Sequence, residues 1–133
     1  GDNALAGFSV LIAEDNPTNL MILEHSLQKY GMHIKTARNG EEAVQLYCAA
    51  GEAFDIVLMD CEMPVLSGPD ATRRIRAFEQ ETGRRNVPVI ALTAHTAPEL
   101  VAEFLGAGMS GHLGKPFRQD TLRNLMLQHL CLA

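Results

Sequence analysis

Residues 8–17 read Phe-Ser-Val-Leu-Ile-Ala-Glu-Asp-Asn-Pro, a short apolar run that ends in two carboxylates. A short, continuous apolar run is typical of a strand that is buried on both faces of a parallel sheet. Pro17 suits the first turn of a helix, and Gly31 suits the position just after its last turn. This stretch therefore predicts a strand at residues 8–13 followed by a helix at residues 17–30.

The same alternation continues to the end of the chain. The other predicted strands are residues 32–37, 54–59, 87–92 and 110–113, and the other predicted helices are residues 41–50, 69–80, 98–105 and 119–130. Strands that alternate with helices imply right-handed crossovers and a parallel sheet covered on both faces. We expect an α/β fold with a doubly wound five-stranded parallel sheet; if it is of the flavodoxin-like (βα)5 kind, with the first strand central, the strand order is 2-1-3-4-5. Its 133 residues suit one domain, at residues 8–131, after a short linker or tag remnant at residues 1–7.

Charge and composition exclude several classes of function. Sixteen Asp and Glu against eleven Lys and Arg give a formal charge of −5, which disfavours binding to nucleic acid or direct contact with an anionic membrane. No apolar run approaches the ~18 residues that indicate a membrane-spanning helix. Three cysteines without Cys-x-x-Cys spacing favour free thiols in a reducing compartment. We therefore expect a cytoplasmic domain.

Chemically active side chains stand at the carboxyl ends of four predicted strands. They are Glu14-Asp15, Asp60, Thr93 and Lys115. Ligands of such sheets bind beyond the carboxyl ends of the strands, so these groups are expected to share one pocket. Neighbouring carboxylates need a cation at neutral pH, and oxygen ligands suit Mg²⁺, with Mn²⁺ as a substitute. A carboxylate beside such a cation can act as a nucleophile toward phosphorus.

Each of these residues also has a plain structural interpretation. An acidic pair after a strand often caps the next helix, and a single Asp or Lys is usually a solvated surface residue. Taken one at a time, these interpretations are favoured. Their joint occurrence at four strand ends favours the functional interpretation.

Four stretches carry a family resemblance. They are Val10-Leu-Ile-Ala-Glu-Asp-Asn16, Ile56-Val-Leu-Met-Asp-Cys-Glu-Met-Pro64 with Gly68, Pro88-Val-Ile-Ala-Leu-Thr-Ala94 and Gly114-Lys-Pro-Phe117. With this spacing the chain resembles the receiver domain of two-component response regulators over about residues 8–130. The Asp-Asn-Pro-x-Asn and Leu-Thr-Ala-His segments look most like the receivers of hybrid sensor histidine kinases, which pass phosphoryl groups along a phosphorelay.

The resemblance implies a role for each acidic residue. Asp60 is expected to accept a phosphoryl group from a phosphohistidine. Asp15 and Asp60 are expected to ligate Mg²⁺ directly, together with the backbone carbonyl of Glu62, while Glu14 acts through coordinated water. Glu62 and His95 occupy the two positions that tune hydrolysis of the aspartyl phosphate in this family.

The remaining site residues of the family also have counterparts. Thr93 is expected to move toward the phosphoryl group, and Lys115 to pair with Asp60 before transfer and with the phosphoryl group afterwards. The bond between Lys115 and Pro116 is expected to be cis, which aims Lys115 into the site. Pro64 and Gly68 are expected to shape the loop after Asp60.

One position departs from the family pattern. The strand-five residue that couples to the Thr as a switch is usually Tyr or Phe, and here it is His112. We expect His112 to be partly exposed and a poor switch; a pH-sensitive switch is the alternative.

The first helix has more apolar residues than one core face needs. The side chains expected to face the core are those of Ile22, Leu23, Leu27 and Tyr30, which leaves Leu20 and Met21 as an exposed pair near the site. In the family, the phosphohistidine partner docks around this helix. We therefore expect a histidine-phosphotransfer protein or the dimerisation domain of a histidine kinase to pack there.

The leading interpretation is a phosphorelay receiver that catalyses its own phosphorylation and dephosphorylation and belongs to a longer hybrid kinase, with the parent chain attached to the inner membrane. The alternatives are a stand-alone response regulator and a pseudo-receiver that only binds proteins. A small-molecule phosphatase with an aspartyl nucleophile is disfavoured, because 133 residues leave no cap domain to exclude water.

Overall fold

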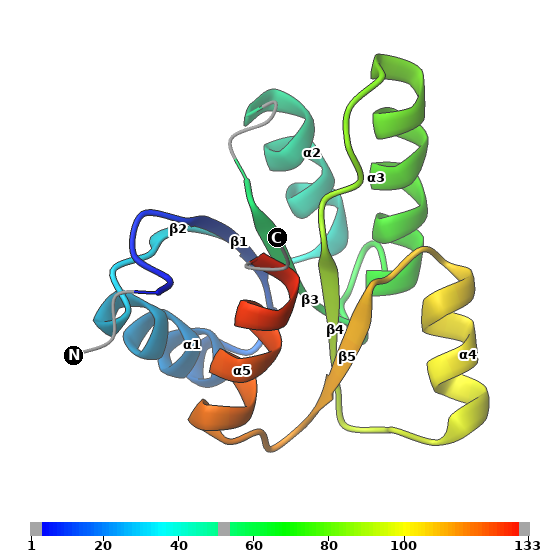
Figure 1. Cartoon of the computed structure of the whole chain (residues 1–133). Helices are drawn as coiled ribbons and strands as arrows, with labels where there is room; N and C mark the ends of the chain where they lie inside the picture. The colour runs from blue at the N-terminus through cyan, green and yellow to red at the C-terminus, as the bar shows by residue number, and fades with distance from the viewer. Residues whose placement is uncertain (1–3, 51–53, 131–133) are drawn as a thin grey trace.

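A computed structural model describes residues 4–50 and 54–130, and it confirms the predicted fold class (Figure 1). The strands are β1 Ser9–Ala13, β2 His33–Ala37, β3 Ile56–Asp60, β4 Val89–Thr93 and β5 Gly111–Gly114. The helices are α1 Pro17–Lys29, α2 Gly40–Ala50, α3 Gly68–Thr82, α4 Pro98–Gly106 and α5 Gln119–Leu130. The strands are all parallel, in the order β2-β1-β3-β4-β5.

The sheet separates two aliphatic layers. Alternate residues of the central strands enter opposite layers, as Ile56 and Val57 of β3 do. Helices α1 and α5 cover one face, and α2, α3 and α4 cover the other (Figure 1). Burial on both faces explains why β1, β3 and β4 are continuous apolar runs rather than alternating ones.

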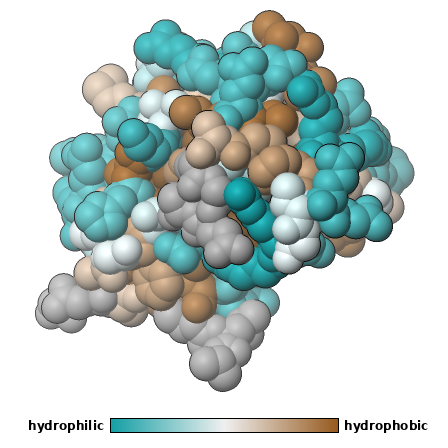
Figure 2. All heavy atoms as spheres, turned by 90° about the horizontal axis from the view of Figure 1, so that it is seen from above, coloured by the Kyte–Doolittle hydropathy of each residue, from teal (hydrophilic) through white to brown (hydrophobic). Residues whose placement is uncertain are grey.

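The strand register places the site residues side by side. Ala13 pairs with Met59, so Glu14 follows β1 at the level of Asp60, and Thr93 pairs with Gly114, just before Lys115. Because the strands are parallel, these residues all emerge at one edge of the sheet. The opposite end of the molecule is mostly hydrophilic, with separate apolar patches (Figure 2).

Local sequence signals fix the helices that border this edge. The side chain of Asn16 accepts hydrogen bonds from the backbone N–H groups of Thr18 and Asn19 at 2.9 and 3.1 Å, and Pro17 opens α1. This is an ordinary N-terminal cap. A Cβ on Gly68 would overlap the carbonyl oxygen of Asp60, so the loop after β3 returns close to the strand only because residue 68 lacks a side chain.

The amino-terminal segment packs on the domain. Leu5 is 1% exposed and lies in the layer that contains α1 and α5. The backbone N–H of Gly7 donates to the carbonyl of Gly31 at 3.0 Å. Residues 4–7, which the sequence assigns to a linker, therefore form a turn against the core. Residues 1–3 of that predicted linker, and residue 131 at the predicted end of the domain, lie outside the described residues.

The apolar stripe of α1 is shifted from the predicted one. Leu20 is 6% exposed and packs in the core, whereas Ile22 is 51% exposed. The prediction that Leu20 is exposed and Ile22 buried is therefore wrong. Leu20, Leu23 and Leu27 have helical spacing as good as that of Ile22, Leu23 and Leu27, so spacing alone could not choose between two adjacent stripes. Met21 is 65% exposed, as predicted.

Candidate phosphoacceptor site

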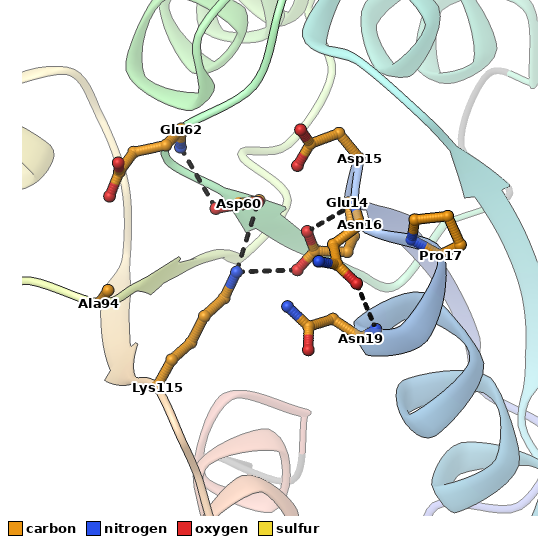
Figure 3. Close-up of a pocket in the computed structure, with 9 residues that line it drawn as sticks. All are labelled: Glu14, Asp15, Asn16, Pro17, Asn19, Asp60, Glu62, Ala94 and Lys115. Carbon is orange, nitrogen blue, oxygen red and sulfur yellow. Dashed lines mark hydrogen bonds and ion pairs between the residues drawn. The ribbon is translucent and has the colours of Figure 1, made fainter.

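A pocket of about 430 Å³ opens at the carboxyl ends of β1, β3 and β5 (Figure 3). Glu14, Asp15, Asp60, Glu62 and Lys115 line it, so five residues predicted from the sequence lie together. Asn16, Pro17 and Asn19 from the start of α1 and Ala94 after β4 complete the lining. Pairing of the strand ends, rather than proximity along the chain, assembles this site.

The ammonium group of Lys115 holds two of the carboxylates. Its Nζ lies 2.9 Å from Oε1 of Glu14 and 3.3 Å from Oδ2 of Asp60 (Figure 3). Glu14 and Asp60 are both buried, at 1% and 4% exposure. The bond between Lys115 and Pro116 is cis. Two carboxylates and one ammonium therefore occupy the floor of the pocket.

Three carboxylates form a group that could hold a metal ion. One oxygen each of Glu14, Asp15 and Asp60 lies within 4.8 Å of the others. Asp15 is exposed at the mouth of the pocket, whereas the other two lie at its floor. An all-oxygen donor set with one side open to solvent suits a hard divalent cation that keeps some of its water.

Hydrogen bonds and neighbouring charges separate the protonation behaviour of the two floor carboxylates, both of which are buried. Burial, the hydrogen bond to Glu14 and the charge of Glu14 raise the pKa of Asp60 to about 7. Burial also acts to raise the pKa of Glu14, but hydrogen bonds with Asp60 and Lys115 outweigh it and lower that pKa. Without a metal ion, Asp60 is thus the floor carboxylate that keeps its proton to the higher pH. A divalent cation would oppose this by favouring both charged forms.

Backbone geometry also aims a donor at Asp60. The N–H of Glu62 donates to Oδ1 of Asp60 at 3.2 Å. The side chain of Glu62 turns outward, and its Oε1 lies 3.6 Å from Nε2 of His95, with both side chains mostly exposed. These two residues face each other across the gap between the loops that follow β3 and β4.

Thr93 stands at the predicted strand end, but its hydroxyl does not line the pocket. The hydroxyl donates to the carbonyl of His95 and accepts from its N–H, both at 3.0 Å. Thr93 lines instead a neighbouring cavity of about 210 Å³, together with Cys61, Leu100 and Phe104. Thr93 and Glu62 therefore line the same neighbouring cavity, whereas Ala94 lines the wall of the carboxylate pocket.

A second, more apolar pocket of about 380 Å³ adjoins the first. Asn19, Ala94 and Lys115 line both, and Ile22, Pro116 and Phe117 line only the second. The sequence analysis missed Asn19, Ile22 and Phe117 as surface groups of the site. Asn19 could have been predicted from the sequence, because it stands in the first helical turn after Glu14-Asp15. His112, on the edge strand β5, is exposed.

The family model for the response regulator receiver domain matches residues 10–127. The chain belongs to this family. As a receiver domain of phosphorelay systems, it has relatives within histidine kinases. The peroxide stress-activated histidine kinase mak3 of Schizosaccharomyces pombe is 36% identical over 129 residues, which cover 96% of this chain and 6% of that kinase. The resemblance to the receivers of hybrid kinases is thus confirmed, and the receiver spans a small part of such a protein.

Two solved receiver structures are similar to this one. The receiver domain of Ssk1, crystallised with the histidine phosphotransfer protein Ypd1 of Saccharomyces cerevisiae, has a TM-score of 0.90 at 32% identity, over 96% of this chain and 92% of that one. The receiver of a sensor histidine kinase from Pseudomonas aeruginosa PAO1, with a magnesium ion in its active-site cleft, has a TM-score of 0.81 at 36% identity, over 95% and 99%. In the part of this receiver that the structure describes, no helix has the length and apolar character needed to cross a membrane.

Proposed function

We propose that this receiver accepts a phosphoryl group on Asp60 from a phosphohistidine, then passes it on or loses it by hydrolysis. The observation that carries the proposal is the contact of Lys115 with both Glu14 and Asp60, two members of the cluster of three carboxylates. A carboxylate oxygen of Asp60 attacks phosphorus, the P–N bond to the donor imidazole breaks, and its electron pair returns to the ring nitrogen. The imidazole then leaves neutral if its other nitrogen carries a proton.

The residues around Asp60 suit the charge that this reaction moves. The Lys115 ammonium group pairs with the Asp60 carboxylate before transfer and would pair with the phosphoryl oxygens afterwards. The N–H of Glu62 already points at Asp60. Thr93 must give up both hydrogen bonds to His95 before its hydroxyl can reach a phosphoryl group. With His112 exposed on β5, we expect only a small accompanying rearrangement there.

We further propose that the metal ion is Mg²⁺, with Mn²⁺ as a substitute. Asp15, Asp60 and the backbone carbonyl of Glu62 would bind it directly, and Glu14 through water. The all-oxygen donor set, and the magnesium found in the Pseudomonas receiver, support this choice. When bound, the ion neutralises charge on the transferring oxygens.

Intact-protein mass spectrometry tests the acceptor. With acetyl phosphate and Mg²⁺, the wild type should gain about 80 Da, the mass of one phosphoryl group that replaces a proton. Asp60→Asn should gain nothing, and Asp15→Asn should gain it far more slowly, since it weakens the metal site. An Asp70→Asn variant, at an exposed carboxylate on α3, controls for loss of negative charge in general. A folded wild type that gains no mass from acetyl phosphate or from a phosphohistidine donor would contradict the proposal.

We propose a histidine-phosphotransfer protein, or the dimerisation domain of a histidine kinase, as the phosphoryl donor. Met21 and Ile22 are exposed on α1, and Ile22 borders the apolar pocket beside the carboxylates. The corrected docking pair is thus Met21 and Ile22, because Leu20 is buried. The complex of the similar Ssk1 receiver with Ypd1 supports a partner of this class.

Charge substitutions test that surface. Met21→Asp with Ile22→Asp should slow phosphotransfer from phosphorylated Ypd1 much more than phosphorylation by acetyl phosphate. Leu105→Asp, at an apolar side chain on α4 that is 53% exposed, is the matched control. Equal slowing with both donors would indicate damage to the site rather than lost docking.

For the parent protein, we propose a hybrid sensor histidine kinase attached to the inner membrane, with this receiver on its cytoplasmic side. The kinase relatives support the parent class.

A further inference from the structure

The apolar pocket beside the carboxylates has the size and the lining of a small-molecule site. Its volume of about 380 Å³ lies within the range of about 300–1,000 Å³ that such sites occupy. Ile22, Ala94, Pro116 and Phe117 form its apolar part. A concave apolar surface with a few polar groups at one end is typical of a site that holds the apolar part of a small ligand and orients its polar part.

The polar end of this pocket is the wall that it shares with the carboxylate pocket. Asn19, Ala94 and Lys115 form that wall. Nζ of Lys115 brings a positive charge to it, beside Glu14 and Asp60. The side chain of Asn19 points from α1 into the carboxylate pocket (Figure 3), and its carboxamide makes no hydrogen bond within the part of the chain that the structure describes. An ammonium group and a carboxamide are therefore available to an anionic or carbonyl group of a ligand.

The direction of phosphoryl transfer brings the leaving group of a donor to this shared wall. The attacking and leaving atoms lie roughly in line through phosphorus. Asp60 attacks from the floor of the carboxylate pocket, where it is 4% exposed, so the leaving group departs toward the mouth. A flat ring on the leaving group has the shape to cross the shared wall and lie against Ile22 and Phe117, whereas a methyl group covers little of that surface.

We propose that the apolar pocket is a leaving-group subsite, and that this receiver accepts phosphoryl groups from aromatic acyl phosphates in preference to acetyl phosphate. This rests on the proposed function, which it deepens by naming a class of phosphodonor. With benzoyl phosphate, a carboxylate oxygen of Asp60 bonds to phosphorus, the P–O bond to the benzoyl group breaks, and its electron pair leaves with benzoate. No proton is exchanged. The phenyl ring lies in the apolar pocket, and the carboxylate of the leaving group faces Lys115 and Asn19.

The test is the ratio of two rates of Asp60 phosphorylation, with benzoyl phosphate and with acetyl phosphate, both followed by intact-protein mass in Mg²⁺. These donors differ by a phenyl ring in place of a methyl group, and their intrinsic reactivities cancel when the ratio is compared between proteins. Wild type should react faster with benzoyl phosphate. The ratio should fall about three- to tenfold in Ile22→Ala, which removes apolar surface from the pocket at a residue that is 51% exposed.

Two further variants control for this substitution. Ile22→Val keeps a branched apolar side chain and should retain most of the ratio. Leu105→Ala removes an exposed apolar side chain on α4 that lines neither pocket, and its ratio should stay within about twofold of wild type.

A binding measurement separates recognition of the ring from the chemistry. Phenacylphosphonate and acetonylphosphonate are analogues of the two donors in which a methylene group replaces the bridging oxygen, so neither transfers its phosphorus. With Mg²⁺, phenacylphosphonate should shift the NMR signals of the Ile22 methyl groups and the Phe117 ring. It should bind about three- to tenfold more tightly than acetonylphosphonate, and Ile22→Ala should remove most of this difference.

The contrary results separate this inference from the proposed function. A ratio that Ile22→Ala leaves unchanged, a faster reaction with acetyl phosphate in wild type, or Ile22 signals that phenacylphosphonate does not shift would each overturn the subsite and leave Asp60 as the acceptor. Phosphorylation by a phosphohistidine donor but by neither acyl phosphate would also overturn this inference alone. If no donor modifies Asp60 in the folded wild type, the proposed function is wrong and the inference is wrong with it.

Discussion

Nζ of Lys115 lies 2.9 Å from Oε1 of Glu14, a residue 101 positions earlier in the chain. This bond joins the end of β5 to the end of β1 across the intervening strands β3 and β4. It provides the positive charge for a buried pair of carboxylates, Glu14 and Asp60, that would otherwise repel each other. The pocket is therefore organised around one ammonium group.

We predict that Lys115→Met destabilises the metal-free receiver by about 1–3 kcal/mol, because it leaves two buried carboxylates without their cation. It should also slow phosphorylation by phosphoramidate at least tenfold, since a charge beside the phosphoryl oxygens is lost (about tenfold in rate per 1.4 kcal/mol). Urea unfolding in EDTA and intact-protein mass measure the two effects. Lys35→Met, at an exposed lysine on β2, is the control. An unfolding midpoint equal to that of wild type would contradict the first expectation.

The raised pKa of Asp60, about 7, predicts a pH-dependent cost of ionising it in the folded protein. The unfolded carboxyl has a pKa of about 4, so stability is lost as the pH rises from about 4 to 7 and then stays level. Asp60→Asn escapes this loss. Without metal at pH 8, it should be more stable than wild type by about 1–3 kcal/mol, and the gain should shrink toward pH 4. Urea unfolding in EDTA at several pH values checks this, and a gain that does not vary with pH would argue against it.

The burial of Leu5 predicts that the domain begins before residue 8. Leu5→Ala should destabilise the receiver by about 2–4 kcal/mol, because Leu5 is 1% exposed within the layer that contains α1 and α5. Leu105→Ala, at an exposed position, should change stability by less than about 0.5 kcal/mol. Urea denaturation measures both. If the two variants unfolded at the same urea concentration, residues 4–7 would be a linker after all.

The sequence predicts the fold and the strand-end chemistry well, because both follow from simple patterns. Continuous apolar runs indicate parallel strands, and parallel strands bring their carboxyl ends together, so Glu14, Asp60 and Lys115 could be placed in one pocket. Orientation is harder to predict. The hydroxyl of Thr93 faces the backbone of His95, which depends on the path of one loop rather than on residue type.

Three further features escaped the sequence analysis for physical reasons. Leu20 of α1 packs in the core. The sequence did not predict this, because the helix could present either of two neighbouring apolar stripes to the sheet. Nothing in the sequence indicates the positive φ of Val65, since β-branched residues such as valine rarely adopt that backbone conformation. Glu79 lies on the charged helix α3 and yet is wholly buried, which no residue near it in the sequence indicates. Such features depend on packing between elements distant in the sequence.

Glu62 and His95 predict a change in the lifetime of the phosphoryl group. Their side chains are exposed and face each other at 3.6 Å beside the acceptor, where they can position or block attacking water. Glu62→Ala and His95→Ala should each change the rate of dephosphorylation several-fold, with Mg²⁺ affinity nearly intact, because the backbone carbonyl of residue 62 remains (about 1 kcal/mol corresponds to fivefold). Decay of the phosphorylated mass and calorimetric titration with Mg²⁺ measure these. His33→Ala, at an exposed histidine on β2, is the control, and unchanged lifetimes in both test variants would refute the expectation.

The buried carboxylate of Glu79 predicts an unequal effect of two tyrosine substitutions. Oε2 of Glu79 accepts from the Tyr47 hydroxyl at 2.7 Å and from the N–H of Val87 at 2.8 Å, while Oε1 pairs with Arg76 at 2.7 Å. This network ties α2 and α3 to the chain just before β4. Tyr47→Phe removes one donor from a carboxylate that has no access to water, so it should destabilise the receiver by about 1–2 kcal/mol.

Tyr30→Phe is the matched control, because no hydrogen bond of the Tyr30 hydroxyl is present within residues 4–50 and 54–130. It should change stability by less than about 0.5 kcal/mol.

Burial, together with Glu79, also raises the pKa of Tyr47 above its usual range, so ionisation of Tyr47 in the folded state is unfavourable. Wild type should therefore lose stability as the pH rises above about 10, more steeply than Tyr47→Phe does. Urea unfolding of the three proteins at pH 7.5 and pH 10.5 distinguishes these expectations. Equal destabilisation by the two substitutions would show that Glu79 does not need the Tyr47 hydroxyl.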